Sequence, residues 1–124
     1  MLLAELIKEL ETFKDIGTVQ SWKRTGAVKY KNEYITVLRI DSSNKAGGSS
    51  VRQGKMWSII VDIKKDFTTL PQWIDLCKYY GKNIDLTPVK TGKLAGNYGI
   101  RFYNMSKDPT VIIIYKIMDY IFGD

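Results

Sequence analysis

The first pattern along the chain is an apolar residue at every third or fourth position near the N-terminus. The residues at this spacing are Leu3, Leu6, Ile7, Leu10 and Phe13. Such spacing places them on one face of an α-helix, with charged residues on the other face. Gly17 follows as a natural helix end. The pattern therefore predicts an amphipathic packing helix over residues 2–16.

After this helix the spacing changes to alternation and to runs of β-branched and aromatic residues, which are typical of strands. The predicted strands cover residues 19–23, 28–31, 34–40, 56–63, 84–87 and 98–103. One face of the fourth strand is formed by Trp57, Ile59, Val61 and Ile63. The five apolar residues at 111–115 predict a buried central strand, and residues 118–122 either continue it or form a short terminal helix.

A second helix is predicted from Pro71 onward. Thr68 or Thr69 can cap it, and Gly81 ends it. Its apolar stripe contains Leu70, Trp73, Ile74, Cys77 and Tyr80. The order of elements predicts a single α+β domain over residues 1–124: an N-terminal helix and a mostly antiparallel twisted sheet of about five to six strands, with the second helix packed on one face.

Residues 42–55 connect two predicted strands and are rich in serine, glycine and basic residues. A connection of roughly fourteen residues is longer than the usual hairpin loop. We therefore expect a mobile basic loop here.

Charge adds a functional hypothesis. The formal charge of +6 is matched by residues 20–55 alone, which contain eight basic and two acidic residues together with several aromatic rings. Cations neutralise phosphates, and flat rings stack on unpaired bases. The sequence therefore predicts nucleic-acid binding, with single-stranded DNA or RNA favoured. The candidate contact residues are Trp22, Lys23, Arg24, Lys29, Tyr30, Lys31, Tyr34, Arg39, Lys45, Arg52, Lys55 and Trp57.

The alternating pattern leaves a second interpretation open for the rings. Trp57 lies in an apolar alternating strand, which favours a place in the core. Tyr30 lies between Lys29 and Lys31, and its pattern fits a core ring and an exposed stacking ring equally well.

Part of the chain resembles a known family. The residues concerned are Tyr34–Ile40, the loop 42–55, Met56–Ile63 and the helical start Gln72-Trp73-Ile74-Asp75-Leu76. This order is similar to single-stranded-DNA-binding domains of the transcriptional positive-cofactor-four family. The resemblance implies binding of unpaired strands by a homodimer, through the sheet face and loops. The chain departs from the family in having a helix before this segment and three predicted strands after it.

An alternative from another class is a Mg²⁺-dependent nuclease that uses Glu33, Asp62 and Lys64. Glu33 opens one predicted strand, and Asp62 and Lys64 close the next, so antiparallel pairing would bring them to one end of the sheet. Two carboxylates and a lysine can hold Mg²⁺ and position a water for attack on a phosphodiester. The arrangement resembles restriction-endonuclease-like nucleases, although their usual Pro-Asp pair is absent.

A further alternative is a protein-directed inhibitor or scaffold, as small basic proteins of viruses and mobile elements often are. Independently of this alternative, the terminal strand and the apolar segment Tyr115–Phe122 fit a homodimer interface and a buried central strand equally well. The segment Lys90–Asn97 contains Gly-Lys, but it lacks the spacing of a phosphate-binding P-loop and precedes a strand, which argues against nucleotide hydrolysis.

The cysteine and histidine content narrows the chemistry. The chain has no histidine and one cysteine, Cys77, so His-based triads and an ordinary structural zinc site are excluded. A single cysteine cannot form an intrachain disulfide, and we expect a reducing, cytoplasmic setting. Met1–Ile7 is too short for a signal peptide and carries Glu5. We expect no membrane partner, and no cofactor apart from Mg²⁺ under the nuclease hypothesis.

Overall fold

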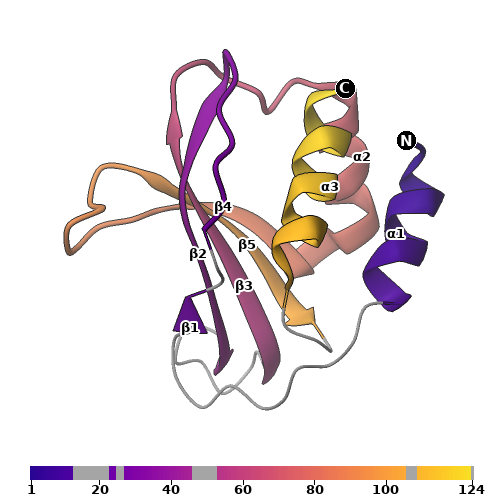
Figure 1. Ribbon diagram of the computed structural model, residues 1–124, viewed down its shortest axis with the longest axis horizontal. Coiled ribbons are helices and arrows are strands. Elements are labelled where there is room, and N and C mark those ends of the chain that lie inside the picture. Colours follow the sequence, from indigo (N-terminus) through magenta and orange to yellow (C-terminus); the bar gives the residue numbers. More distant parts are fainter. Residues whose placement is uncertain (13–22, 25–26, 46–52, 106–108, 124) are drawn as a thin grey trace.

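The computed structural model describes residues 1–12, 23–24, 27–45, 53–105 and 109–123. Its elements are α1 (Leu3–Thr12), β1 (Lys23–Arg24), β2 (Ile35–Lys45), β3 (Gln53–Ile63), α2 (Pro71–Tyr80), the 3-10 turn η1 (Gly81–Asn83), β4 (Ile84–Pro88), β5 (Tyr98–Met105) and α3 (Val111–Phe122). The strands form one antiparallel sheet in the order β1-β2-β3-β5-β4. All three helices lie on one side of this sheet (Figure 1).

This arrangement confirms the predicted α+β class, with its N-terminal helix and mostly antiparallel sheet. The described sheet has four full strands and the two-residue β1. The predicted number of five to six strands was therefore slightly too high. The described part of the chain also contains a third helix, α3, which includes the residues 118–122 that the sequence left open as a terminal strand or a short helix.

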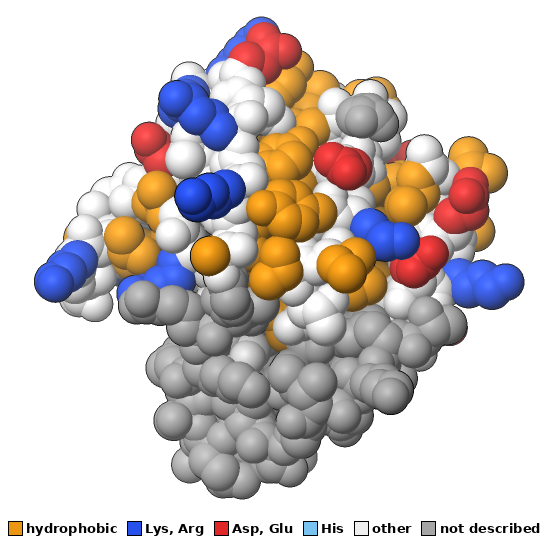
Figure 2. Space-filling model, in the orientation of Figure 1, with side chains coloured by type: hydrophobic (Ala, Val, Ile, Leu, Met, Phe, Trp, Pro, Cys, Tyr) orange, Lys and Arg blue, Asp and Glu red, His pale blue; other side chains and the backbone are white. Residues whose placement is uncertain are grey.

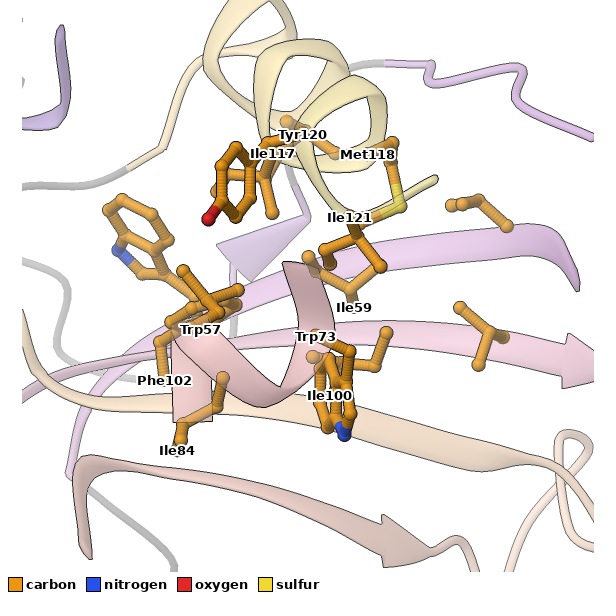
Figure 3. Close-up of a cluster of buried hydrophobic side chains, with 14 of the residues drawn as sticks. Trp57, Ile59, Trp73, Ile84, Ile100, Phe102, Ile117, Met118, Tyr120 and Ile121 are labelled. Atoms are coloured by element: carbon orange, nitrogen blue, oxygen red, sulfur yellow. The ribbon is translucent and has the colours of Figure 1, made fainter. Parts of the chain in front are cut away.

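The core lies between the sheet and the helices (Figure 3). Alternation along β3 directs Trp57, Ile59 and Val61 into it, each fully buried. The neighbouring strand β5 contributes Ile100 and Phe102 to the same face, because the register pairs Ile59 with Ile100 and Trp57 with Phe102. The alternating pattern of β3 therefore predicted the buried face correctly.

The segment predicted as a central strand, 111–115, is instead the first part of helix α3. Thr110 caps this helix, since its Oγ1 accepts a hydrogen bond from the backbone N–H of Ile113 at 3.3 Å. The helix is apolar on most sides because it packs against α1 and α2 as well as lying over the sheet. Such a helix carries no clear periodicity, which is why a short apolar run could not separate helix from strand.

The predicted loop 42–55 is also shorter than expected, because β2 continues to Lys45 and β3 begins at Gln53. Ser42 and Ser43 pair with Trp57 and Met56, so the strand ladder overrides the weak strand preference of serine. The connection that remains, 46–52, lies outside the described residues.

Three smaller predictions differ in their bounds. The N-terminal helix is seen over Leu3–Thr12, and residues 13–16 lie outside the described part of the chain, as does most of the predicted strand 19–23. Residues 28–31 do not form a strand; they contribute only an isolated bridge from Lys31 to Thr36. Strands 84–87 and 98–103 are confirmed as β4 and β5.

Helix α2 begins at Pro71 and ends at Gly81, as predicted. Its N-cap is Leu70, which provides no side-chain cap, so the prediction that a threonine caps the helix was wrong. Thr68 is occupied elsewhere, because its N–H and hydroxyl both donate to Asp66 Oδ1, at 2.9 and 2.7 Å. Within the predicted stripe, Ile74 is 39% exposed, and the buried position is taken by Leu76 instead.

Candidate nucleic-acid interface

Charge is divided unevenly between the two layers of the protein. The three helices together carry five acidic and three basic residues, so the excess positive charge of the chain lies outside them. Figure 2 shows this division on one face of the molecule, with most basic side chains over the sheet and most acidic ones over the helices. The helical layer therefore carries a net negative charge, while the rest of the chain is positive.

Four of the predicted contact residues come together at one end of the sheet. Lys23 and Arg24 pair with Ser42 and Asp41, and Lys45 lies at the end of β2, opposite Gln53. Lys55 lies near the start of β3. The structure describes only the backbone of these four residues. Their backbones occupy three adjacent strands, within about 10 Å across the sheet and about 13 Å along it.

Lys29 and Lys31 lie near the opposite end of β2, where both side chains are exposed. Lys31 bridges to Thr36, so a strand rise of about 3.4 Å per residue places it about 30 Å from Lys45. Lys64 and Lys65 lie at the same end, since both of their N–H groups donate to the carbonyl of Tyr34. The predicted cations thus form two groups along the β2 side of the sheet rather than one patch.

Arg39 lies between these groups, on the sheet face that carries no helix. It is ion-paired within its own strand, with Nε 2.9 Å from Asp41 Oδ2. The Asp41 side chain is 12% exposed and that of Arg39 is 37% exposed. Part of the guanidinium therefore remains available to a ligand while Nε is occupied.

Trp57 is not available for stacking on a ligand, since it is fully buried and its ring lies 6.0 Å from that of Phe102. The prediction that Trp57 contacts nucleic acid was therefore wrong. Trp57 is a core residue, because it lies on the face of β3 that packs against the helices. Trp22 and Arg52 lie outside the described residues.

Tyr30 and Tyr34 are half-buried and use their rings within the protein. Both stack on Phe122, with ring centroids 6.2 and 5.5 Å away. Tyr115 fixes the same segment, because its hydroxyl accepts from the N–H of Lys29 at 2.9 Å and donates to the carbonyl of Lys29 at 3.1 Å. These rings therefore attach residues 27–34 to α3, and only their outer edges remain for a ligand.

The residues of the nuclease hypothesis lie at one end of β2 and β3, as antiparallel pairing required. Asp62 pairs with Thr36, and all three side chains, those of Glu33, Asp62 and Lys64, are exposed. Glu33 is engaged by Lys65, with Nζ 3.6 Å from its Oε2. Within the described ranges, no group of three or more His, Cys, Asp or Glu side chains is arranged to hold a metal ion.

A row of polar side chains, which the sequence pattern did not predict, crosses the helix-free face of the sheet. Asp41 on β2 pairs with Ser58 on β3, Ser58 pairs with Arg101 on β5, and Arg101 pairs with Asp85 on β4. Directly paired residues point to the same face of a sheet. Along the row, an acidic residue is followed by a serine, an arginine and a second acidic residue. Only the strand register brings these four residues together.

Asp85, at the β4 end of this row, accepts a hydrogen bond on each of its carboxylate oxygens. Thr87 donates to Asp85 Oδ1 at 2.6 Å, and Tyr103 donates to Asp85 Oδ2 at 2.9 Å. Burial and the hydrogen bond to Asp85 raise the pKa of the Tyr103 hydroxyl, while the nearby Arg101 partly offsets this. The carboxylate is thus held by neutral donors that stay protonated at neutral pH.

Two donors in the centre of the row are unsatisfied. Ser58 Oγ and Arg101 Nε are buried, and neither has a hydrogen-bond partner in the described part of the structure. Both atoms border Gly99, where a Cβ would lie 3.1 Å from Ser58 Oγ and 3.4 Å from Arg101 Nε. A buried donor without a partner costs about 1–3 kcal/mol of folding free energy. The presence of two such donors side by side in the fold therefore needs an explanation.

Comparisons with known proteins found no matching family model, no matching curated protein and no matching solved structure. The residues that the structure describes include no helix both long enough and apolar enough to cross a membrane. Function must therefore be argued from the site itself.

Proposed function

We propose that this chain is a non-enzymatic nucleic-acid-binding protein that favours single strands. The observation that carries the proposal is the backbone convergence of Lys23, Arg24, Lys45 and Lys55 on three adjacent strands at one end of the sheet. Clustered cations bind a phosphate backbone by releasing its condensed counterions. Four basic residues on a short stretch of three adjacent strands would offer several phosphate contacts, where an isolated surface charge would offer one.

The remaining charge distribution supports an extended path along the sheet. Arg39 lies between the sheet-end cluster and the exposed pair Lys29 and Lys31, of which Lys31 lies about 30 Å from Lys45. Proteins that bind single strands without strong sequence preference commonly cover about 4–16 nucleotides for each domain. The acidic helical layer would repel the same polyanion, which favours approach from the sheet side.

The proposal depends more on phosphate contacts than on aromatic stacking. Trp57 is buried, and Tyr30 and Tyr34 are partly covered by Phe122. Preference for a single strand would then depend on bases reaching the partly exposed residues of the helix-free face, such as Arg39 and Arg101. The homodimer expected from the sequence remains a prediction, which sedimentation of the complex would test.

Fluorescence anisotropy tests the proposal with labelled single-stranded DNA, single-stranded RNA and duplex DNA, each titrated at several salt concentrations with and without Mg²⁺. We expect tighter binding to single strands, with a log–log salt slope of about −0.7 for each phosphate contacted. The double variant Lys45→Gln/Lys55→Gln should bind more weakly and with a shallower slope. Its matched control, Lys8→Gln/Lys78→Gln, removes the same charge from the helical layer and should leave binding nearly unchanged.

Other outcomes would decide between the alternatives. If no oligonucleotide binds at low salt, the proposal is wrong and a protein-directed inhibitor or scaffold becomes the better hypothesis. If Mg²⁺ produces cleavage that Asp62→Asn abolishes, the nuclease hypothesis with Glu33, Asp62 and Lys64 replaces it.

A further inference from the structure

We infer that Ser58 and Arg101 form a site for the edge of an unpaired nucleobase, with guanine as the best match. This inference rests on the proposed function and names what the helix-free face of the sheet recognises. Its basis is the pair of buried donors beside Gly99, which have no acceptor in the described structure. Both atoms border Gly99, so a ligand that reached this position with two adjacent acceptor atoms would satisfy both.

The charges around this space favour a neutral ligand over a phosphate. The two nearest rows on this face contain two arginines and two aspartates, Arg39, Arg101, Asp41 and Asp85, so their formal charges cancel. A phosphate placed here would gain attraction from the guanidinium groups but would meet two carboxylates at similar range. A base edge carries hydrogen-bond acceptors without net charge, and it therefore avoids this repulsion.

The carboxylates are already satisfied by the protein, which leaves the donors as the available groups. Asp41 accepts from Arg39, and Asp85 accepts from Thr87 and Tyr103. Of the four nucleobases, guanine presents the adjacent acceptors O6 and N7, and arginine is the side chain that most commonly binds them. In the proposed contact, Arg101 Nε–H and Ser58 Oγ–H donate to these two acceptors.

Gly99 keeps the position beside the two donors free of a side chain. Gly99 is buried between its cross-strand partners Ile60 and Thr87, and any larger residue would place a Cβ against Ser58 Oγ and Arg101 Nε. Arg101 itself is only partly buried. Rotation of its side chain would therefore open a path to Ser58 for an incoming base.

The test uses labelled single-stranded oligonucleotides of about 12 nucleotides. All are oligothymidine except for one central position, which is guanine, 7-deazaguanine or adenine. The 7-deaza base lacks the N7 acceptor and is otherwise close to guanine. We expect wild-type protein to prefer the guanine oligonucleotide about tenfold over the 7-deaza form. Arg101→Ala and Ser58→Ala should remove this preference.

Lys78→Ala is the control, since it removes one positive charge from an exposed residue of helix α2, outside the proposed binding path. It should keep the guanine preference. Gly99→Ala should lose the preference because its methyl group fills the space between the donors, and Arg101→Lys should lose it with charge retained. These two variants keep the inference testable if Arg101→Ala does not fold, and circular dichroism monitors folding throughout.

The outcomes separate this inference from the proposed function. If wild-type protein binds the oligonucleotides but does not distinguish guanine from 7-deazaguanine, the inference is wrong while the proposed function stands. If Arg101→Ala weakens every oligonucleotide equally and lowers the salt slope by about 0.7, Arg101 contacts a phosphate, which also overturns the inference. If wild-type protein binds none of them, the proposed function itself fails.

Discussion

Replacing Phe122 with alanine should destabilise the protein strongly, because this ring joins three separate segments of the chain. Its centroid lies 6.2 Å from that of Tyr30, 5.5 Å from that of Tyr34 and 5.5 Å from that of Phe67. Through these contacts, helix α3 holds the segment before β2 and the segment after β3. Removal of the ring would loosen all three attachments together.

The magnitude follows from burial and ring contacts. Truncation of a fully buried phenylalanine costs about 3–5 kcal/mol, and each aromatic pair contributes about 0.5–1.5 kcal/mol beyond its buried area. Phe122 is only partly buried, so we expect a loss of about 2–4 kcal/mol in the free energy of unfolding. Phe122→Leu keeps most of the volume but not the ring, and it should cost about half as much.

Urea denaturation measures this loss, followed by tryptophan fluorescence and far-ultraviolet circular dichroism. The matched control is Ile112→Ala on the same helix, since Ile112 is 67% exposed and should change stability by less than about 0.5 kcal/mol. A loss for Phe122→Ala that is no greater than that of the control would refute the argument that these rings fasten α3 to the sheet connections.

Three further predictions follow from single contacts. Thr110→Ala should cost about 1 kcal/mol by removing the cap on Ile113 N–H, while a serine at this position should restore it, as measured by thermal unfolding. Burial, assisted by the charges of Tyr79 and Glu11, raises the pKa of Tyr80. The native state therefore keeps a proton that the unfolded state releases above about pH 10, so stability should fall as pH rises above this value. Tyr80→Phe should reduce the fall, as measured by urea denaturation across this pH range. Trp57→Phe should lower the unfolding midpoint but leave the salt slope of oligonucleotide binding unchanged, and a changed slope would return this residue to the interface.

Local patterns predicted several elements and the side of each that packs in the core. The alternation in β3 identified its core side, the period of three to four residues identified α1, and Gly81 marked the end of α2. Helix α3 could not be separated from a strand, because burial on several sides removes the periodicity that distinguishes them. Its actual start signal was Thr110, a cap that becomes meaningful only once a helix is assumed.

The candidate site was predicted less well for a different reason. The cationic residues were visible in the sequence, but their division into two groups depends on how β1, β2 and β3 pair. The polar row depends entirely on register, since Asp41, Ser58, Arg101 and Asp85 are far apart along the chain and have no common local signal. A shift of one residue in any strand would turn its member of the row to the opposite face.

The most direct test of the account is to map the bound surface by nuclear magnetic resonance while a single-stranded oligonucleotide is titrated into isotope-labelled protein. The account predicts that backbone amide shifts change at Lys23, Arg24, Lys45 and Lys55 and around Gly99 and Arg101 on β5, with little change in α1 and α2. Shift changes confined to the helical layer, or no changes at all with oligonucleotide in excess, would contradict it.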